Sequence, residues 1–330
     1  MPSFAKFGND LYTGERSFDF IKQRKIWYAI AIAMIIASIL IPVIRGGFNF
    51  GIEFRGGSQF VITGVTEVDQ GKAQAAVDSV EPNAVPRVSA LGQDGIRVQT
   101  DQLTDEQSDE VRQALADTYG VPVEEITASF IGASWGADVT SQAIKGLVVF
   151  LVLAAIVMAL YFRTWKMSAA AMLALLHDLV ITAGVYAATG FEITPAAVIG
   201  FLTILGYSLY DTVVVFDKIR ENTAKLTDGS RYTFAESVNL AVNQTLVRSI
   251  NTAVVAALPV ASILFIGAFI LGADTLRDIS LALLVGIIVG TYSTIFIAAP
   301  LYVDLRRHEP RFVKHDSRVL AVREKSEVNA

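Results

Sequence analysis

Apolar stretches long enough to cross a membrane recur along this chain, with polar segments between them. They occupy residues 26–44, 146–162, 167–188, 193–216, 248–271 and 279–303. A transmembrane helix needs about 20 mostly apolar residues to span the hydrocarbon core of a bilayer. The pattern therefore predicts an α-helical polytopic membrane protein with six transmembrane helices.

The first apolar stretch follows Lys22, Arg24 and Lys25, an arrangement that secretory signal peptides also have. Its 19 uncharged residues exceed the apolar region of a usual signal peptide, and no small-x-small cleavage site follows. We therefore expect a retained membrane helix that is preceded by a polar tail of residues 1–25.

Residues 45–142 have the hydropathy of a soluble domain and interrupt the series of membrane stretches. Thr104 and Gln107 have the spacing of a capping box, which marks the start of a helix. The apolar patterns predict strands at 58–63, 85–91, 95–100 and 124–131, and helices at 69–80 and 104–119. The order β-α-β-β-α-β is that of an α+β ferredoxin-like domain.

Residues 217–247 form a second polar segment, between the fourth and fifth membrane stretches. Asp228-Gly229-Ser230 predicts a turn, and Thr233 with Glu236 predicts another capping box. Apolar residues follow at helical spacing, at Phe234, Val238, Ala241 and Val242. We expect a cytoplasmic linker whose helix lies on the membrane surface ahead of the fifth span.

Composition supports the membrane interpretation. The chain is 53% hydrophobic and only 18% charged, and its mean hydropathy is +0.48. These values lie outside the usual range of soluble proteins. The chain has no cysteine, which excludes disulfides and thiolate metal sites.

The basic residues predict how the chain is oriented. Six spans place both termini on one side, and 19 Lys and Arg residues fall on that side, within 1–25, 163–166, 218–248 and 304–330. The short links on the other side contain only Arg277. By the positive-inside rule, both termini are cytoplasmic and residues 45–142 are extracytoplasmic, in a multi-pass protein of the cell membrane. The basic tail of residues 304–330 is mainly a topology signal, although it also suits contact with membrane lipids.

Asp211 is the main candidate for chemistry, because it interrupts the fourth apolar stretch. A carboxylate at membrane depth costs about 2.5–3.5 kcal/mol on insertion scales, and such residues usually serve a partner or a water path. Arg248 begins the fifth span at a similar depth, with Thr252 on its face, and Ser208 shares the face of Asp211. These residues could form a proton relay. The alternative is a structural ion pair, or side chains that reach to the cytoplasmic interface.

His177 and Asp178 lie near the middle of the third span. His177 could be a second relay element, or it could make a packing hydrogen bond to a neighbouring helix. Because adjacent residues point in different directions on a helix, we do not expect the two side chains to form a pair.

The glycine-rich segment 51–57 (GIEFRGG) lacks the spacing of a phosphate-binding loop. We interpret Gly51, Glu53, Gly56 and Gly57 as a structural turn into the first strand. No metal-ligand spacing and no nucleophile triad occurs, so we expect neither an enzyme nor a bound metal, and no nucleic-acid partner.

Four segments resemble the SecF branch of the SecD/SecF family, which belongs to the resistance-nodulation-division superfamily. They are 206–222 (GYSLYDTVVVFDKIREN), 51–57, 248–252 (RSINT) and 286–293 (GIIVGTYS). The resemblance extends from about residue 18 to residue 303. The chain length favours SecF over its larger paralogue SecD, and the form of the segment 248–252 resembles actinobacterial members.

The resemblance implies a subunit that uses the proton motive force, with SecD, to complete preprotein translocation through the SecYEG channel after insertion driven by SecA. It also implies functional links to YajC and YidC, unfolded preproteins as clients, and the proton as coupling ion without another cofactor. Asp211 would carry the proton, with Arg248 as its partner and Thr252 as a further candidate. This chain departs from the family at Glu53, where Asp is usual, and at Tyr210, where Asn is usual.

Two other functions remain open at this point. The chain could be a proton-coupled exporter of small molecules or lipids from the same superfamily. It could also be a passive scaffold for SecD, with Asp211 and Arg248 as a structural pair. Sodium could replace the proton as coupling ion, since a carboxylate at this depth can serve either.

Overall fold

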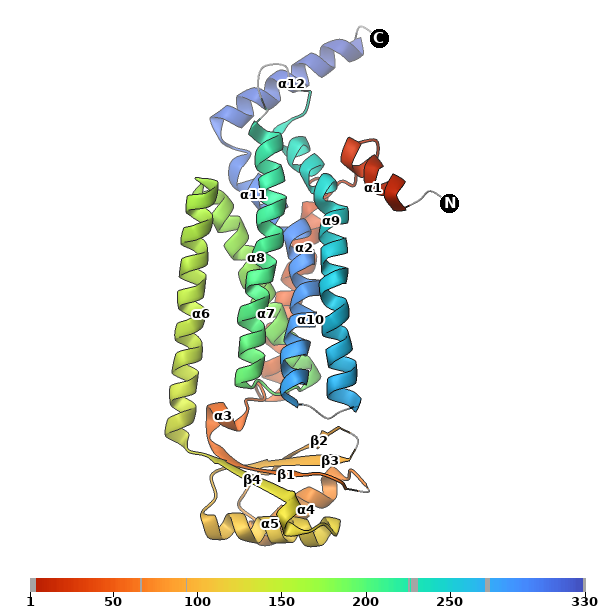
Figure 1. The fold of residues 1–330 in the computed structure, drawn as a ribbon. Helices are drawn as coiled ribbons and strands as arrows, with labels where there is room; N and C mark the ends of the chain where they lie inside the picture. Colours follow the sequence, from red (N-terminus) through yellow and green to blue (C-terminus); the bar gives the residue numbers. More distant parts are fainter. Residues whose placement is uncertain are drawn as a thin grey trace.

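The computed structural model describes residues 4–65, 67–92, 94–224, 226, 231–270 and 274–328. A bundle of long helices stands on a small αβ domain, and both ends of the described chain lie at the far end of the bundle (Figure 1). The helices α1 (Phe4–Thr13) and α12 (Pro310–Val328) lie at that far end. The turn predicted at residues 228–230 lies outside the described residues.

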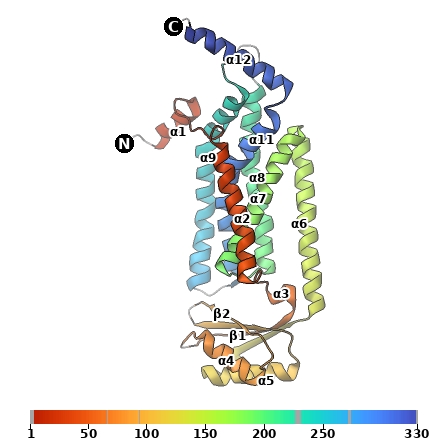
Figure 2. The same cartoon turned by 180° about the vertical axis from the view of Figure 1, so that it is seen from behind.

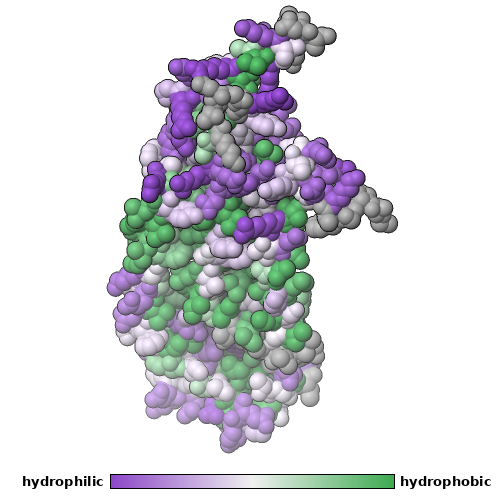
Figure 3. Space-filling model, turned by 45° about the horizontal axis from the view of Figure 1, so that its top comes forward, coloured by the Kyte–Doolittle hydropathy of each residue, from purple (hydrophilic) through white to green (hydrophobic). Residues whose placement is uncertain are grey.

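Six helical segments of the described chain are long and apolar enough to cross a membrane, as the sequence predicts. They are α2 (Arg24–Arg45), α6 (Ala133–Phe162), α7 (Trp165–Thr189), α8 (Pro195–Ala224), a fifth segment that begins with α9 (Phe234–Ser262), and a sixth that begins in α10 (Asp274–Ser293). The fifth continues as the π-helical segment η2 (Ile263–Ile270), and the sixth as the π-helical segment η3 (Thr294–Ala298) and α11 (Ala299–Arg306). The surface is mainly hydrophobic around the middle of the bundle and hydrophilic at its ends (Figure 3).

The six segments divide into inner and outer helices. About half of the apolar window is buried in α7 and in the sixth segment (56% each), and 44% in α8. The corresponding values are 11% or less in α2, α6 and the fifth segment. Of these outer helices, α2 packs against α7 on the face that Figure 2 shows, and α6 stands at the edge of the bundle (Figure 1). The polar groups buried inside the bundle therefore lie on or against α7, α8 and the sixth segment.

Two of these helices begin earlier than the sequence predicts. The expected surface helix before the fifth span is instead the first part of α9, which runs unbroken from Phe234 into the span. The predicted capping box at Thr233 and Glu236 is confirmed, and no Gly or Pro follows before Pro259 to end the helix. Similarly, α6 begins at Ala133 rather than at residue 146.

The αβ domain has the predicted order of strands and helices. These are β1 (Gly57–Ile62), α4 (Gln70–Val80), β2 (Arg87–Leu91), β3 (Gly95–Thr100), α5 (Asp105–Tyr119) and β4 (Ile126–Ile131), with a short 3-10 turn η1 (Val123–Glu125) before β4. The strands form one antiparallel sheet in the order β2-β3-β1-β4. The helices α4 and α5 cover the sheet face that points away from the bundle (Figure 1).

The strand β3 is buried along its whole length, so its two faces meet different surroundings. Ile96 and Val98 belong to the apolar core of the domain, together with Phe60 of β1 and Leu115 of α5. Side chains alternate along a strand, so Arg97 lies on the opposite face. It forms an ion pair with Glu192, which lies in the link between α7 and α8. The sheet thus contacts the bundle directly.

A short helix, α3 (Ile52–Arg55), joins α2 to this sheet through two glycines. Gly56 has φ +77°, and a Cβ there would lie 3.0 Å from Ala133 Cα at the start of α6. Gly57 has φ +137°, and a Cβ there would overlap the carbonyl oxygen of Thr100 in β3. Both positions combine a backbone conformation that favours glycine with no space for a side chain.

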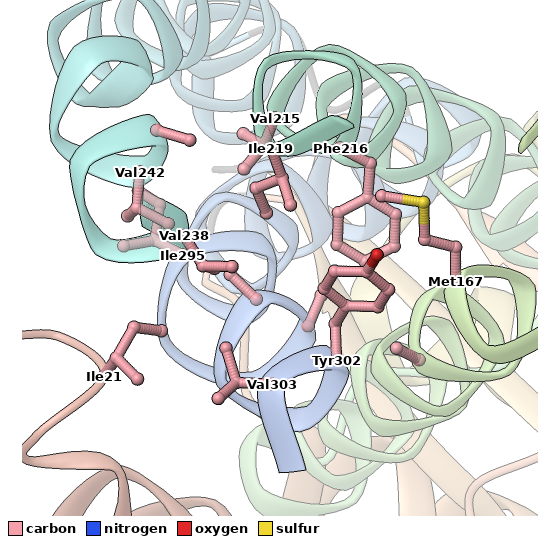
Figure 4. Packing of buried hydrophobic residues seen from close by; sticks show 14 of the residues in the cluster. Ile21, Met167, Val215, Phe216, Ile219, Val238, Val242, Ile295, Tyr302 and Val303 are labelled. Carbon is pink, nitrogen blue, oxygen red and sulfur yellow. The ribbon is translucent and has the colours of Figure 1, made fainter. Parts of the chain in front are cut away.

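An apolar core closes the end of the bundle that lies near the termini (Figure 4). Phe216 and Ile219 of α8 meet Val242 of α9 and Tyr302 of α11 there. The rings of Phe216 and Tyr302 lie 5.7 Å apart. The buried polar groups begin further along α8, on the side of this core that faces the αβ domain.

The helices α8 and α10 share an extensive contact, and small residues make it close. A Cβ on Gly286 would overlap Ile204, and one on Gly290 would lie 3.0 Å from Ser208 Cβ. Nearer the αβ domain, a Cβ on Gly200 would lie 2.7 Å from Ala282 Cβ. Spacing of small residues by four positions allows two membrane helices to approach closely. This contact sets the distance between the polar groups of the two helices.

We predict that Gly286→Ala destabilises the protein by about 1–3 kcal/mol, because the added methyl group must displace Ile204. Gly206→Ala is the matched control in α8, where a Cβ would meet nothing within 4 Å. Thermal unfolding of both variants in detergent measures the effect. Equal stability of Gly286→Ala and the parent protein contradicts the close packing of α8 and α10.

Candidate functional site

Eight polar side chains lie buried together where α7, α8, α9 and the sixth span meet, and we call them the buried polar cluster. They are His177, Asp178, Ser208, Asp211, Thr212, Ser249, Ser293 and Thr294. Hydrogen bonds connect residues of different helices within the cluster. Polar groups at this depth are costly unless they are paired, so their concentration marks a candidate functional site.

Asp178 of α7 is the centre of one half of the cluster. Ser208 Oγ of α8 and Ser293 Oγ of α10 both donate hydrogen bonds to Asp178 Oδ2, at 2.7 and 2.8 Å. His177 Nδ1 lies 3.1 Å from the other carboxylate oxygen. Two hydroxyl donors and one imidazole nitrogen thus surround an acid of which only 2% is exposed. Asp178 therefore connects three membrane helices.

The expectation that His177 and Asp178 do not pair is wrong. Their Cα–Cβ bonds diverge on the helix, but the imidazole is long enough for Nδ1 to reach back to the neighbouring carboxylate. His177 Nε2 and the Tyr292 hydroxyl are both buried without a hydrogen-bond partner in the described part of the chain. The two rings lie 6.2 Å apart between their centroids. This region can thus exchange a proton or accommodate a water molecule.

Asp211 of α8 has fewer partners than Asp178. Ser249 Oγ of α9 donates to Asp211 Oδ1 at 2.9 Å, whereas Oδ2 is buried without a partner among the described residues. The residue is 5% exposed. A carboxylate with one unpaired oxygen in an apolar bundle strongly favours taking up a proton or a water molecule. Of the two acids, Asp211 is the one whose protonation the geometry leaves open.

Arg248 lies close enough to Asp211 to interact with it electrostatically, but neither Arg248 nor Thr252 makes a direct hydrogen bond or ion pair with it in the described residues. Arg248 is exposed on the bundle surface, and the described residues include no ion pair between it and Asp211. One position on a helix turns the side chain by about 100°, so Ser249 rather than Arg248 faces Asp211. Thr252 Oγ1 donates to the carbonyl oxygen of Arg248 at 2.8 Å, within its own helix. Tyr210 is 56% exposed on the outer face of α8.

The two halves of the cluster are joined along α8. Ser208, which binds Asp178, precedes Asp211 by three residues, or about one helical turn. Thr212 and Thr294 share a hydrogen bond of 2.9 Å, and Thr294 begins the π-helical segment η3. Such segments frequently occur at functional sites, because they offset the helix register locally. Within the described residues, the two halves of the cluster are neighbours on α8, and no hydrogen bond connects Asp211 and Ser249 with Asp178 and its partners.

The sequence signals only part of this site. Asp178 stands out as a charge in an apolar stretch, but Ser249, Ser293, Thr212 and Thr294 do not, because hydroxyl groups in membrane helices commonly bond their own backbone. Only the packing of the helices shows which hydroxyl groups point at a carboxylate. No group of three or more His, Asp or Glu side chains in the described chain is arranged to hold a metal ion.

Comparison with protein families gives two matches. Residues 110–308 match the family described as protein export membrane protein SecD/SecF, C-terminal. Residues 45–66 match the SecD/SecF GG motif, which includes α3 and its two glycines. The first match covers more than half of the chain and every member of the buried polar cluster.

Named relatives agree with the family match. The chain is 46% identical to the protein translocase subunit SecF of Streptomyces coelicolor, over 98% of this chain and 86% of that protein. It is 42% identical to the subunit of the same name from Mycobacterium tuberculosis, over 95% of this chain and 73% of that protein. The similarity to these proteins is actinobacterial in character, as the segment 248–252 predicts.

Solved structures extend the agreement to the fold. The crystal structure of SecDF from Thermus thermophilus aligns with a TM-score of 0.77 at 30% identity, over 89% of this chain. A structure of SecDF in a super-membrane-facing form aligns with a TM-score of 0.63 at 29% identity, over 92% of this chain. The chain spans only 39% and 40% of those two chains.

We predict that Asp178→Asn destabilises the protein by about 1–3 kcal/mol, because a neutral amide oxygen accepts weaker hydrogen bonds from Ser208 and Ser293 than a carboxylate oxygen does. Asp138→Asn, on the exposed side of α6, is the matched control and should stay within about 0.5 kcal/mol of the parent protein. Thermal unfolding in detergent measures both. A variant at position 178 that is as stable as the control contradicts the role of Asp178 in joining the helices.

Proposed function

The chain belongs to the SecD/SecF family of protein export membrane proteins and has an accessory role in Sec translocation at the cell membrane, and we propose that a flow of protons through its buried polar cluster powers that role. The observation that carries the proposal is Asp211, buried between α8 and α9 with one carboxylate oxygen unpaired. Such a group can change its protonation state without any rearrangement of fixed partners.

The free energy from proton movement is similar to the cost of a buried carboxylate. Moving one proton across the membrane yields about 2.3 kcal/mol per 100 mV. Exposing or burying an ionised carboxylate at this depth costs about 2.5–3.5 kcal/mol on insertion scales. Protonation and deprotonation of Asp211 can therefore bias two arrangements of the bundle.

Asp178 and Asp211 have separate tasks in this proposal. Asp178 is held by Ser208, Ser293 and His177 and connects the helices. Asp211 receives and releases the proton, and Ser249 orients it. His177 is the exit or entry of the path on the α10 side, next to Tyr292. The proton is the coupling ion, and no other cofactor takes part.

Association with SecD and with the Sec translocase follows from the family. We propose SecYEG, SecA, YajC and YidC as the further partners and unfolded preproteins as the clients. Arg248 and Tyr210 support a second subunit at this place, because both are exposed on the bundle surface at the level of Asp211. A charged side chain at such a depth needs cover from protein or water. An approaching SecD would bring Arg248 into the path.

We also propose that the termini are cytoplasmic and that the αβ domain is an extracytoplasmic ferredoxin-like domain. The distribution of Lys and Arg supports the orientation, as does the position of both ends at one end of the bundle (Figure 2). The order of elements and the antiparallel strand order β2-β3-β1-β4 support the fold. The domain then lies where a preprotein emerges from the channel.

We predict that Asp211→Asn abolishes the stimulation of preprotein translocation by the proton motive force. The amide has the shape of the carboxyl group but cannot give up a proton. Translocation into inverted membrane vesicles, with and without a proton gradient, measures the effect. Membrane insertion and co-purification with SecD should remain as in the parent protein.

Asp217→Asn is the matched control. Asp217 is half-buried on the same helix, near the polar end, and accepts a hydrogen bond from Tyr161. Gradient-dependent translocation should survive this change. Undiminished stimulation in Asp211→Asn contradicts the proton role and leaves a passive scaffold as the better account.

A further inference from the structure

The αβ domain is attached to the bundle by backbone as well as side-chain contacts. The segment between α2 and α3 pairs with the link between α7 and α8: Ile193 N donates to Asn49 O at 2.7 Å, and Gly51 N donates to Ile193 O at 3.0 Å. These bonds bring α3 against the end of α7 and the start of α8. We call the charged groups around this contact the junction.

Arg97 and Glu192 connect the sheet to the bundle at the junction. Arg97 Nη1 of β3 lies 3.0 Å from Glu192 Oε2 in the link between α7 and α8. The two side chains are only 11% and 14% exposed. Because the pair is largely buried, loss of either side chain would leave the other charge buried without a counter-charge.

Asp278 brings α10 into the same junction. Thr194 Oγ1 donates to Asp278 Oδ2 at 2.8 Å, and Arg277 Nε lies 3.4 Å from Oδ1. The Tyr186 hydroxyl of α7 donates to the backbone oxygen of Asp278 at 2.6 Å. The helix that begins here carries Ser293 of the buried polar cluster further along.

Glu53 of α3 adds a third carboxylate to the two guanidinium groups. The charges that face it are Glu192 from the link between α7 and α8, Arg97 from β3, and Asp278 from α10, with Arg277 beside Asp278. The helix α6 also packs against α3, but it does so through the uncharged Gly136. Glu192 and Asp278 each have an arginine partner, and Arg55 and Arg87 add positive charge near Glu192, whereas Glu53 forms no ion pair among the described residues.

Glu53 is therefore the one carboxyl group of the junction, among the described residues, without a partner of opposite charge. Its Oε2 is buried without a hydrogen-bond partner in the described chain, in the space that a Cβ on Gly51 would need. Burial raises the pKa of the Glu53 carboxyl above its usual value, and Glu192 and Asp278 add to the increase. A cavity of about 580 Å³, lined by Ser89 and Gln99 of the sheet and Thr189 of α7, borders Glu192 and gives water a route to the junction.

We propose that Glu53 is a second proton-binding site of this protein and that its protonated form holds the αβ domain against the bundle. This inference rests on the proposed function, because it adds a site that senses protons outside the membrane. Protonation removes the one carboxylate charge that has no ion-pair partner among the described residues and leaves the Arg97–Glu192 and Arg277–Asp278 pairs in place. Loss of the proton leaves a buried, unpaired carboxylate, and the domain is released.

The direction of the pH dependence follows from linkage. A carboxyl group whose pKa is raised in the docked state binds its proton more tightly there than after release. Docking is therefore strongest below the ordinary glutamate value of about 4.3. It weakens as the pH rises through the raised pKa of the docked state. An energised membrane is more acidic on its outer side, where the αβ domain is proposed to lie. Energisation would therefore favour docking of the domain.

The test uses two spin labels on the full chain in lipid nanodiscs. The chain has no cysteine, so Ser89→Cys in β2 and Thr189→Cys at the end of α7 place the labels on either side of the cavity. Pulsed electron resonance then gives the distance distribution between pH of about 4 and 8, which brackets the range from the ordinary glutamate value upward. We expect one short distance at low pH and a change to a longer, broader distribution as the pH rises.

Glu53→Gln should abolish this change and keep the short distance at every pH, because the amide imitates the protonated acid. Glu53→Asp keeps an ionisable group and should keep a pH-dependent step with a shifted midpoint. Glu124→Gln, on the exposed surface of the domain, is the matched control and should leave the step unchanged. A distance that does not change with pH in the parent protein overturns the proposal, and so does an unchanged step in Glu53→Gln.

The two proposals can fail separately. The distance measurement needs no proton gradient and no preprotein. Asp211→Asn should therefore keep the pH-dependent change in distance that Glu53 causes. If Asp211→Asn translocates normally while the step persists, the proton path through the bundle is wrong and the junction site stands. If the step is missing while Asp211→Asn abolishes gradient-driven translocation, only the junction site is wrong.

Discussion

The close contact between α8 and α10 is the constraint on which the rest of the structure depends. Gly286 and Gly290 leave no side chain between the two helices, so Ser208 comes within reach of the same carboxylate as Ser293. A side chain at either glycine would separate the hydroxyl groups and leave Asp178 short of donors in an apolar environment. The polar chemistry of the bundle is thus a consequence of how tightly two membrane helices pack.

Two buried acids with different surroundings make the bundle suited to moving a proton. Asp178 has three hydrogen-bond partners and connects α7, α8 and α10, whereas Asp211 has one donor and an unpaired oxygen among the described residues. In the proposed mechanism, Asp178 keeps the helices together while Asp211 changes charge. Because α10 also begins at the junction through Asp278, a shift of this helix would reach the αβ domain directly.

The sequence was sufficient for the six spans, the order of elements in the αβ domain and both capping boxes, because these depend on local patterns. It did not separate α9 from a surface helix, since polar residues in a helix do not show where the membrane begins. It identified Asp211 by the cost of its charge, but not Ser249, because a serine on a membrane helix has no such cost. Arg248 shows the same limit: sequence spacing gives depth, and only packing shows which way the side chain points.

The most direct test of the central claim is proton flux through the protein itself. The chain, reconstituted with SecD in proteoliposomes that contain a pH-sensitive dye, should carry protons down an imposed gradient. Asp211→Asn should reduce this flux to that of empty liposomes, while the flux of Asp217→Asn stays at the parent level. Equal flux in the parent protein and in Asp211→Asn would contradict the account, because Asp211 would then not be the group that carries the proton.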